Sequence, residues 1–515
     1  MFGLLSRATA NLKNSASPSR WSPGDDVPSG FVPHQTRLAV PLSSLGTFAF
    51  RSTGQYAQGT VVFERAEAQA GPEPPSYGEA VQEKPRVEGT VDIAVEARTN
   101  SDGLYGECRL EVVEGHERGG LSLTTPASAS VSRLGASLSY HITVTFPATF
   151  TALDTLFVET SGFRLILAPS LSAVSIGTLS LRTTDAPIVL SSTRCGTAQL
   201  ANQNQLDPNR HALKNFDDLI SGALTCTGRC DVACENGPIS GAYTADGSLT
   251  VRTSNFALRG EFRGASVRIH NANAEISGTF AASQRTVVVS NMHGKVEGAF
   301  TAPGGCEVKG QYVAIKGDFE VGEHLRLLTT VFRIDATIRL VAAAPTSSSS
   351  RAPASSLAVT RVATASSDLP TYADDSLLTS SVPGIVTVTA ETTDAGIELL
   401  FPAPVPGGCA LRAMARSSGG ARVGVTHASG WEGRFSATTS LTHTASLRTP
   451  PSAAAGTVPV RYDVQKRNDV RGSVGSSASA AGEAGGAGGG GGGGGGAAGN
   501  ATVVEADGEA EIVLL

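Results

Sequence analysis

The sequence lacks the features that mark membrane spans, disulfide frameworks and exported proteins. Its 515 residues include only 7 Cys and 3 Met, and no apolar run approaches the ~18 residues that cross a bilayer. An odd, small number of cysteines favours reduced thiols. The start MFGLLSRATANLKNS has no apolar core typical of a secretory signal. These absences predict a cytoplasmic protein with no transmembrane segment.

Two other locations stay open. The first 24 residues carry Arg7, Lys13 and Arg20 without an acid and are rich in Ser and Ala, which is also the composition of a mitochondrial transit peptide. Residues 1–34 are therefore predicted to be a disordered N-terminal tail, with a transit peptide as one alternative. Location at the cell surface by unconventional export is the other.

Excess charge of either sign is also missing. Lys and Arg number 40 against 46 Asp and Glu, and no block of basic residues stands out. A protein that tracks nucleic-acid phosphates needs a basic patch or stripe, so nucleic acid is not expected as a partner. What the sequence does have is 59 Gly and 26 Pro with 40% apolar residues, which indicates many turns around a sizeable core and an all-β fold.

A five-residue phrase, aliphatic–x–Gly–x–aromatic or aliphatic, recurs through the middle of the chain. Its glycines are spaced by 19, 19, 18, 20 and 19 residues, and an aliphatic column seven residues before the phrase keeps the same spacing. The glycines are Gly222, Gly241, Gly260, Gly278, Gly298 and Gly317. A fixed period with local alternation predicts a repetitive β-solenoid of about 19-residue coils, which bury their aliphatic columns only by stacking.

Two further columns suggest how each coil turns. Asn236, Asn255 and Asn273, followed by His293 and Tyr312, lie between the aliphatic columns, where Asn is expected to turn the corner with a positive φ. The glycine column predicts a bend or a close backbone approach in every coil. Ala336 replaces the glycine in the last copy, so residues 327–338 are expected to form an end coil.

Composition divides the rest of the chain. The solenoid is predicted over 35–342 with an exposed Pro-rich loop at 66–88, and an Ala/Ser/Pro low-complexity linker follows at 343–382. Residues 383–515 alternate as strands and are expected to form a second β unit that continues the sheet or solenoid. A poly-Gly loop at 475–499 interrupts it, and the chain is predicted to return to the sheet afterwards.

The Pro-rich loop contains a Pro-Pro-x-Tyr element, formed by Pro74, Pro75, Ser76 and Tyr77. Two prolines favour the polyproline II form, which the aromatic groove of a WW domain accepts. The expected partner is a WW-domain protein, such as a ubiquitin ligase. A rigid loop with a buried Tyr77 is the alternative.

The common catalytic signatures are missing as well. The sequence has no His-Glu-x-x-His, Gly-x-Ser-x-Gly or phosphate-loop motif, and Glu235, Glu261, Glu275, Glu297 and Asp318 do not share one position of the repeat. Cys226, Cys230 and Cys234 match no usual zinc or iron–sulfur spacing, and small apolar fillers between coils are the favoured interpretation. No catalytic residue, metal or cofactor is predicted.

The repeated coils, the segment LGTFAFRSTGQYAQGTVVFER, the Pro-Pro-Ser-Tyr element and the closing GWEGRFSATTS and DGEAEIVL resemble an uncharacterised fungal family related to adhesin-like β-solenoid domains. The resemblance implies a fold and no activity. The leading prediction is a non-enzymatic interaction scaffold that docks WW domains. A cell-surface adhesion or glycan-binding protein is the alternative, and a polysaccharide-active β-helix enzyme is the second alternative.

Overall fold

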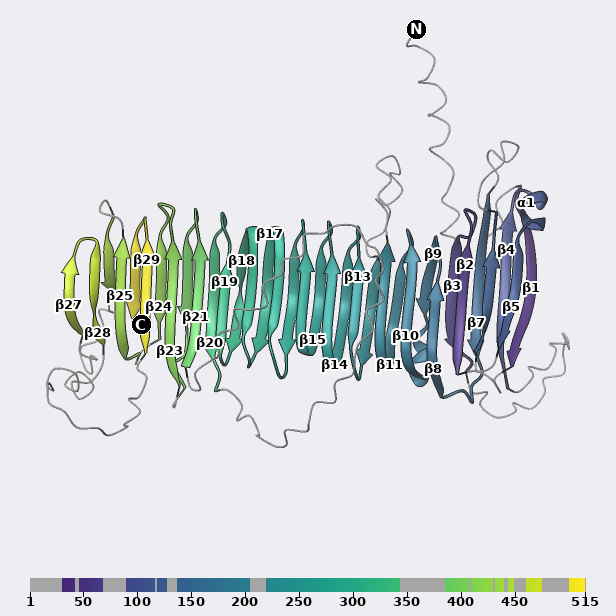
Figure 1. Ribbon diagram of the computed structural model, residues 1–515, viewed down its shortest axis with the longest axis horizontal. Coiled ribbons are helices and arrows are strands. Elements are labelled where there is room, and N and C mark those ends of the chain that lie inside the picture. Colours follow the sequence, from purple (N-terminus) through teal and green to yellow (C-terminus); the bar gives the residue numbers. More distant parts are fainter. Residues whose placement is uncertain are drawn as a thin grey trace, which may run out of the picture. The chain divides into compact units, whose positions relative to one another are not determined.

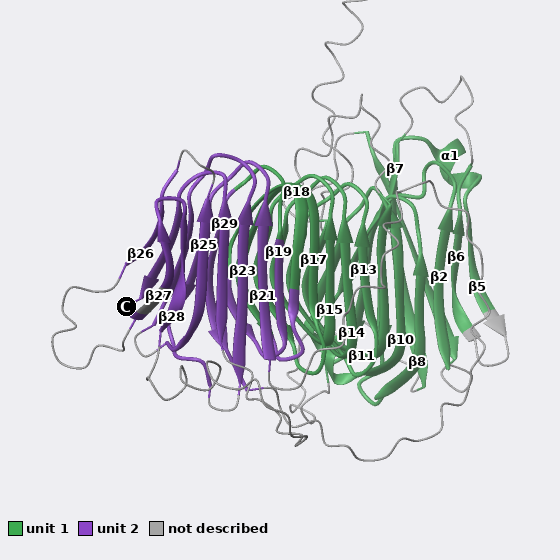
Figure 2. Cartoon of the chain, turned by 60° about the vertical axis from the view of Figure 1, so that its left-hand side comes forward, with its two compact units in different colours: residues 1–301, 307–317, 328–332 green, residues 302–306, 318–327, 333–515 purple. Residues whose placement is uncertain are grey.

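The computed structural model describes residues 30–41, 46–67, 89–115, 118–126, 137–203, 219–342, 385–406, 409–428, 431–439, 443–448, 460–474 and 500–514. Most of them are in β-strands and very few are in helices, which confirms the all-β repetitive fold (Figure 1). The chain forms two compact units, one of residues 1–301, 307–317 and 328–332 and the other of residues 302–306, 318–327 and 333–515 (Figure 2). They are called unit 1 and unit 2 below.

Each coil of unit 1 gives one strand segment to each of two β-ladders, called A and B. Ladder A consists, in spatial order, of β1 (Val32–Pro41), β4 (Thr90–Thr99), β7 (Leu138–Phe146), β3 (Gly59–Arg65), β9 (Phe163–Leu167), the start of β11 (Ile188–Gln203), β12 (Ile220–Cys226), the starts of β14 (Ile239–Thr253) and β15 (Leu258–Asn271), β16 (Ile276–Ala282) and the end of β17 (Val287–Ala302).

Ladder B consists of β5 (Arg109–Gly115), β6 (Arg118–Thr124), β2 (Thr47–Thr53), β8 (Ala152–Glu159), β10 (Ser175–Thr184), the end of β11, β13 (Cys230–Cys234), the ends of β14 and β15 and the start of β17. From β2 and β3 onward the pairings within both ladders are parallel. Side chains of alternate residues point between the ladders, where the aliphatic and aromatic columns form the core.

The register of ladder A places the repeated phrases directly on one another. Gly222, Gly241, Gly260 and Gly278 are successive partners, and all four have a positive φ. A Cβ added to Gly260 would come within 1.9 Å of the Gly241 carbonyl oxygen. The close backbone approach predicted for the glycine column is therefore confirmed, and it explains why a residue with a side chain is excluded there.

Antiparallel strands close one end of each ladder of unit 1. In ladder A, β4 runs antiparallel to both β1 and β7, and in ladder B, β5 runs antiparallel to β6. A short helix, α1 (Asp102–Gly106), lies between β4 and β5 and buries Leu104, and a 3-10 helix, η5 (Pro169–Ala173), buries Leu171. The terminal strands of this stack therefore differ from the internal ones, as is usual for the end repeats of a solenoid.

Unit 2 is also built from stacked strands. One strand, β18 (Cys306–Val321), has residues in both units. One of its ladders pairs β21 (Ile385–Thr392), β23 (Ala410–Ser417), β29 (Ala501–Ala506), β25 (Gly433–Thr439), β28 (Asp469–Val474) and β27 (Val460–Lys466). The other pairs β20 (Ile334–Leu340), β22 (Ile397–Phe401), β24 (Val423–His427), β30 (Ala510–Leu514) and β26 (Ala445–Arg448). The remaining strand, β19 (His324–Leu328), pairs with β21.

The last two strands of the chain lie between strands of unit 2 that precede them in the sequence. β29 pairs with both β23 and β25, and β30 pairs with both β24 and β26, although β25 and β26 precede them in the sequence. Residues 501–514 therefore insert between coils formed by earlier residues. The chain thus pairs with both ladders of unit 2 after residues 475–499, which lie outside the described residues.

The prediction that residues 327–338 form an end coil is wrong. Ile334 of β20 pairs with Ile397 of β22 in a parallel register, so the ladder continues after the 343–382 segment, which lies outside the described residues. Loss of the glycine at Ala336 leaves the strand pairing intact, because Ala336 still has a register partner, Leu399.

Candidate binding surface

The residues predicted to dock a partner, Pro74, Pro75 and Tyr77, lie outside the described residues, as do positions 1–29. The structure therefore leaves the docking prediction untested. A different candidate surface comes from the repeat itself, at the column that was expected to turn the corner.

That column forms a line of linked side chains along one edge of unit 1, called the corner line. The Asn255 amide donates to the Asn236 side-chain oxygen at 2.6 Å, and the Asn273 amide donates to Asn255 at 2.7 Å. His293 continues the line through a 3.0 Å contact with Asn273, and its ring stacks on Tyr312 with centroids 5.0 Å apart. The spacing follows from strand pairing, which repeats every ~4.8 Å.

The backbone at these positions differs from the prediction. Among the described residues other than glycine, only Asp185 and Ser192 have a positive φ. The prediction that the Asn residues adopt the left-handed conformation is therefore wrong. The three Asn do lie at bends between strands, whereas His293 and Tyr312 lie within β17 and β18. Their shared property is the stacking of planar side chains from one coil to the next.

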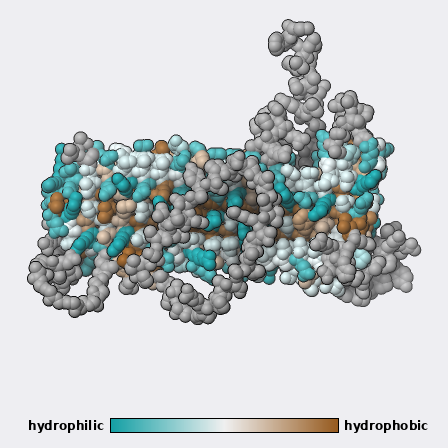
Figure 3. Space-filling model, viewed as in Figure 1, coloured by the Kyte–Doolittle hydropathy of each residue, from teal (hydrophilic) through white to brown (hydrophobic). Residues whose placement is uncertain are grey.

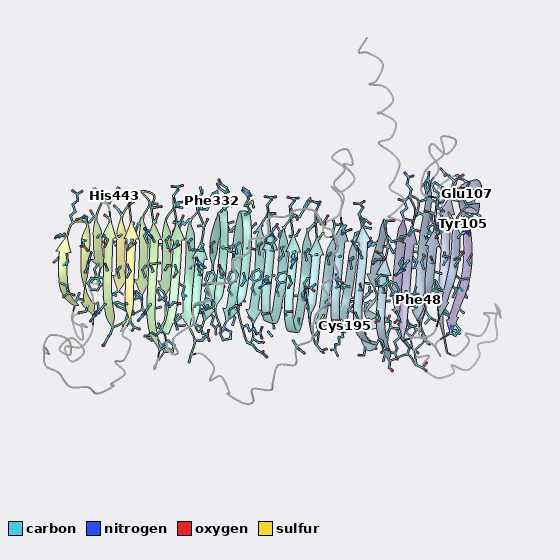
Figure 4. All side chains as sticks on the ribbon, in the orientation of Figure 1. Phe48, Tyr105, Glu107, Cys195, Phe332 and His443 are labelled. Atoms are coloured by element: carbon cyan, nitrogen blue, oxygen red, sulfur yellow. The ribbon has the colours of Figure 1, made fainter. Side chains whose placement is uncertain are left out.

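Exposed aromatic rings gather at the same corner. Tyr312 is 45% exposed, Phe332 is 46% exposed and Phe256, which follows Asn255, is 38% exposed. The backbone at Thr330 bonds to the Gln311 carbonyl, beside Tyr312, so Phe332 belongs to the next coil. Figure 4 places Phe332 at the ends of the strands, where the coils turn. Apolar rings kept in water beside a row of amides are typical of a contact surface.

The outer faces of the coils are different in character, because several of their acids are paired with basic side chains. Glu261 pairs with Arg263 at 3.2 Å, Glu275 pairs with Arg259 at 3.3 Å, and Glu297 contacts Lys295 and Lys316. Hydrophilic side chains cover much of the described strands in Figure 3, with apolar ones between them. Alternating charges of this kind solvate a face and do not by themselves form a site.

Cys226, Cys230 and Cys234 are buried in the core of unit 1, as predicted, and Cys195 lies with them. Cys195, Cys226 and Cys230 are buried between the ladders, and the Cys195 and Cys226 sulfurs lie 3.2 Å apart. Burial raises the pKa of Cys234 to about 12, and hydrogen bonds to Cys226 together with burial raise those of Cys195 and Cys230. The thiols of Cys195, Cys230 and Cys234 therefore stay protonated at neutral pH. In the part of the chain that the structure describes, no group of His, Cys, Asp and Glu side chains could hold a metal.

Comparisons with known proteins add little. No family model and no curated protein matches the chain. It is similar to the crystal structure of a "putative cell adhesion protein" from Clostridium sporogenes, with 11% identity, a TM-score of 0.19, and coverage of 54% of this chain and 100% of that one. At that TM-score the likeness says nothing about the function of this chain. Among the described residues, no helix is long and apolar enough to cross a membrane.

The corner column is visible in the sequence, but its role differs from the predicted one. The signal was the change from Asn to His293 and Tyr312 at a fixed position, because rings do not replace Asn where a turn needs a positive φ. Planar amides and rings share the ability to stack. The position of Phe332 carried no such signal, since it lies one residue beyond the column.

Proposed function

We propose that the chain is a non-enzymatic interaction scaffold of the adhesin-like β-solenoid type, and that the corner line of unit 1 is its contact surface. The observation that supports this is the row of exposed, mutually bonded side chains on successive coils. Because the ladders fix the spacing, the row offers similar chemistry every ~4.8 Å to an extended partner. A row of side chains held in place by the paired strands on either side also binds with little loss of conformational entropy.

A second contact of the scaffold is the Pro-Pro-x-Tyr element, which we propose recruits a WW domain, such as that of a ubiquitin ligase, in the cytoplasm. The test is a pull-down of purified WW domains by the full chain. Tyr77→Ala should abolish binding of the WW domains. The control, Tyr372→Ala, alters a tyrosine that follows a single proline, and it should bind the WW domains as the wild type does. Equal retention by wild type and Tyr77→Ala would contradict the docking proposal.

The alternative is glycan binding, with adhesion at the cell surface as its setting. It is favoured by the exposed rings of Tyr312 and Phe332, because aromatic faces stack on the apolar faces of sugars. On an array of immobilised glycans, Tyr312→Ala with Phe332→Ala should reduce binding of any glycan that the wild type retains. Fractionation of cells separates the compartments, since a protein confined to cytosol or mitochondria is no surface adhesin.

A polysaccharide-active enzyme is the second alternative. The pairing of Glu261, Glu275 and Glu297 with basic side chains favours the non-enzymatic proposal, because a general acid needs a carboxyl group with a raised pKa. Incubation of the full chain with soluble polysaccharides should release no new reducing ends. Their release would overturn the proposal.

A further inference from the structure

Three cationic or ionisable side chains of ladder B lie together on its outer face. Arg252 of β14 is the register partner of His270 of β15, and Arg268 precedes His270 by two residues on the same face of the strand. All three are exposed. The His270 ring contacts the Ser290 hydroxyl at 2.7 Å. These residues are called the cationic group below.

Two carboxylates of nearby coils, those of Asp231 and Glu307, already have basic partners. Asp231 pairs with Arg229 at 2.6 Å, and Glu307 lies 3.7 Å from Lys309. Arg252 and Arg268 have no ion-pair partner within the described ranges of the chain. Although His270 is exposed by its surface area, partial desolvation of its ring, followed by the charges of Arg252 and Lys309, lowers its pKa. Two guanidinium groups beside a neutral ring therefore lack an anion.

The cationic group borders the corner line. Arg252 lies three residues before Asn255, and His270 lies three residues before Asn273, in the same two coils. A single extended ligand could therefore reach the guanidinium groups, the row of amides and the rings of His293 and Tyr312. Guanidinium groups bind carboxylates and sulfates in a bidentate fashion, amides bind hydroxyl groups, and aromatic rings bind sugar faces.

We propose that this combined surface binds an acidic polysaccharide, whose carboxylate or sulfate groups contact Arg252 and Arg268 while its hydroxyl groups contact the corner line. The inference rests on the proposed function and names its ligand class. Nucleic acid fits less well, because tracking a phosphate backbone takes many cations and the chain has a net charge of -6. An acidic peptide would leave the row of amides and rings without a matching partner.

The test is equilibrium binding of the full chain to polygalacturonate and dextran sulfate, which separate carboxylate from sulfate. Neutral dextran, duplex DNA and poly-glutamate serve as comparison ligands. The wild type should bind at least one acidic polysaccharide about tenfold or more tightly than dextran, with binding that weakens as salt rises. Arg252→Gln with Arg268→Gln should weaken that binding at least ~tenfold.

The control variant carries Arg164→Gln with Arg194→Gln, which removes the same charge from exposed residues of ladder A strands. It should bind acidic polysaccharides as the wild type does, and thermal unfolding checks that both variants fold. Unchanged binding by the Arg252 and Arg268 variant would overturn the inference, as would equally tight binding of DNA or poly-glutamate. Equal binding of dextran and the acidic polymers would overturn the inference and leave the scaffold proposal standing.

Discussion

The ring of Phe280 lies almost parallel to that of Phe262, with centroids 5.4 Å apart and planes 10° apart. Tyr243 and Phe300 extend the stack on either side, and all four side chains are buried. The repeat places them in register, so each ring fills the space left by the coil before it. Their burial joins neighbouring coils into one cooperative core.

Removal of one ring from this stack should be costly. We expect Phe280→Ala to lower the free energy of unfolding by ~3–5 kcal/mol, because the cavity cannot close against rigid ladders. Phe280→Leu refills most of the volume and should cost less than half as much. Urea unfolding measures both values. If leucine costs as much as alanine, side-chain volume is not what the column requires.

The glycine column gives a second prediction, about backbone geometry. Gly260 has a φ of +145°, and an added Cβ would meet the Gly241 carbonyl oxygen at 1.9 Å. Gly260→Ala should therefore destabilise unit 1 by at least ~2 kcal/mol, measured by thermal unfolding. Gly424 of β24 is the matched control, because its added Cβ meets nothing within 4 Å. Similar losses at the two positions would count against a role for close approach.

The coils could be predicted because the chain repeats its own constraints. Gly241 and Gly260 recur at the same place in successive coils, since each needs the same approach to the coil before it. The insertion of residues 501–514 could not be predicted in the same way. The register partner of Ala501 is Arg412, far away in the sequence, and β-pairing between such distant segments leaves no periodic trace.

The candidate surface was predictable in part. Alternation along β15 already places Arg268 and His270 on one face of the strand. That Arg252 lies beside them depends on the register between coils, which shifts between Ala245 and Ser248. Sequence spacing alone does not locate such a shift, so neighbours across coils had to come from the structure.

The inserted coil leads to a third prediction, about unit 2. Val504 of β29 is fully buried between β23 and β25, while the adjacent Val503 points to the other face and is half-buried. Val504→Asp places a carboxylate in the core and should cost several kcal/mol, on the order of the free energy that holds a unit together. Limited proteolysis should then cleave unit 2 rapidly. Val503→Asp is the control and should leave cleavage slow, and equal cleavage of both variants would contradict the inserted arrangement.

The last prediction concerns His427, the most deeply buried histidine of unit 2. Its ring lies between Phe401 and Trp431, with centroids 5.0 Å and 4.5 Å away, and its Nε2 contacts the Thr502 hydroxyl at 3.0 Å. Burial lowers the pKa of His427 to about 3, from 6.5. The His427 ring is therefore neutral in folded unit 2 at neutral pH.

The pH dependence follows from this shift. In the unfolded chain, His427 becomes protonated below pH 6.5, whereas in the folded chain it stays neutral until about pH 3. Because the unfolded chain binds more protons between these values, acid favours unfolding. The stability is present in full above pH 6.5 and falls by up to ~1.4 kcal/mol per pH unit below it. Between pH 7.5 and 5, the wild type should lose ~2 kcal/mol more in urea unfolding than His427→Gln does. Equal losses in the two proteins would show that His427 does not set the acid sensitivity of unit 2.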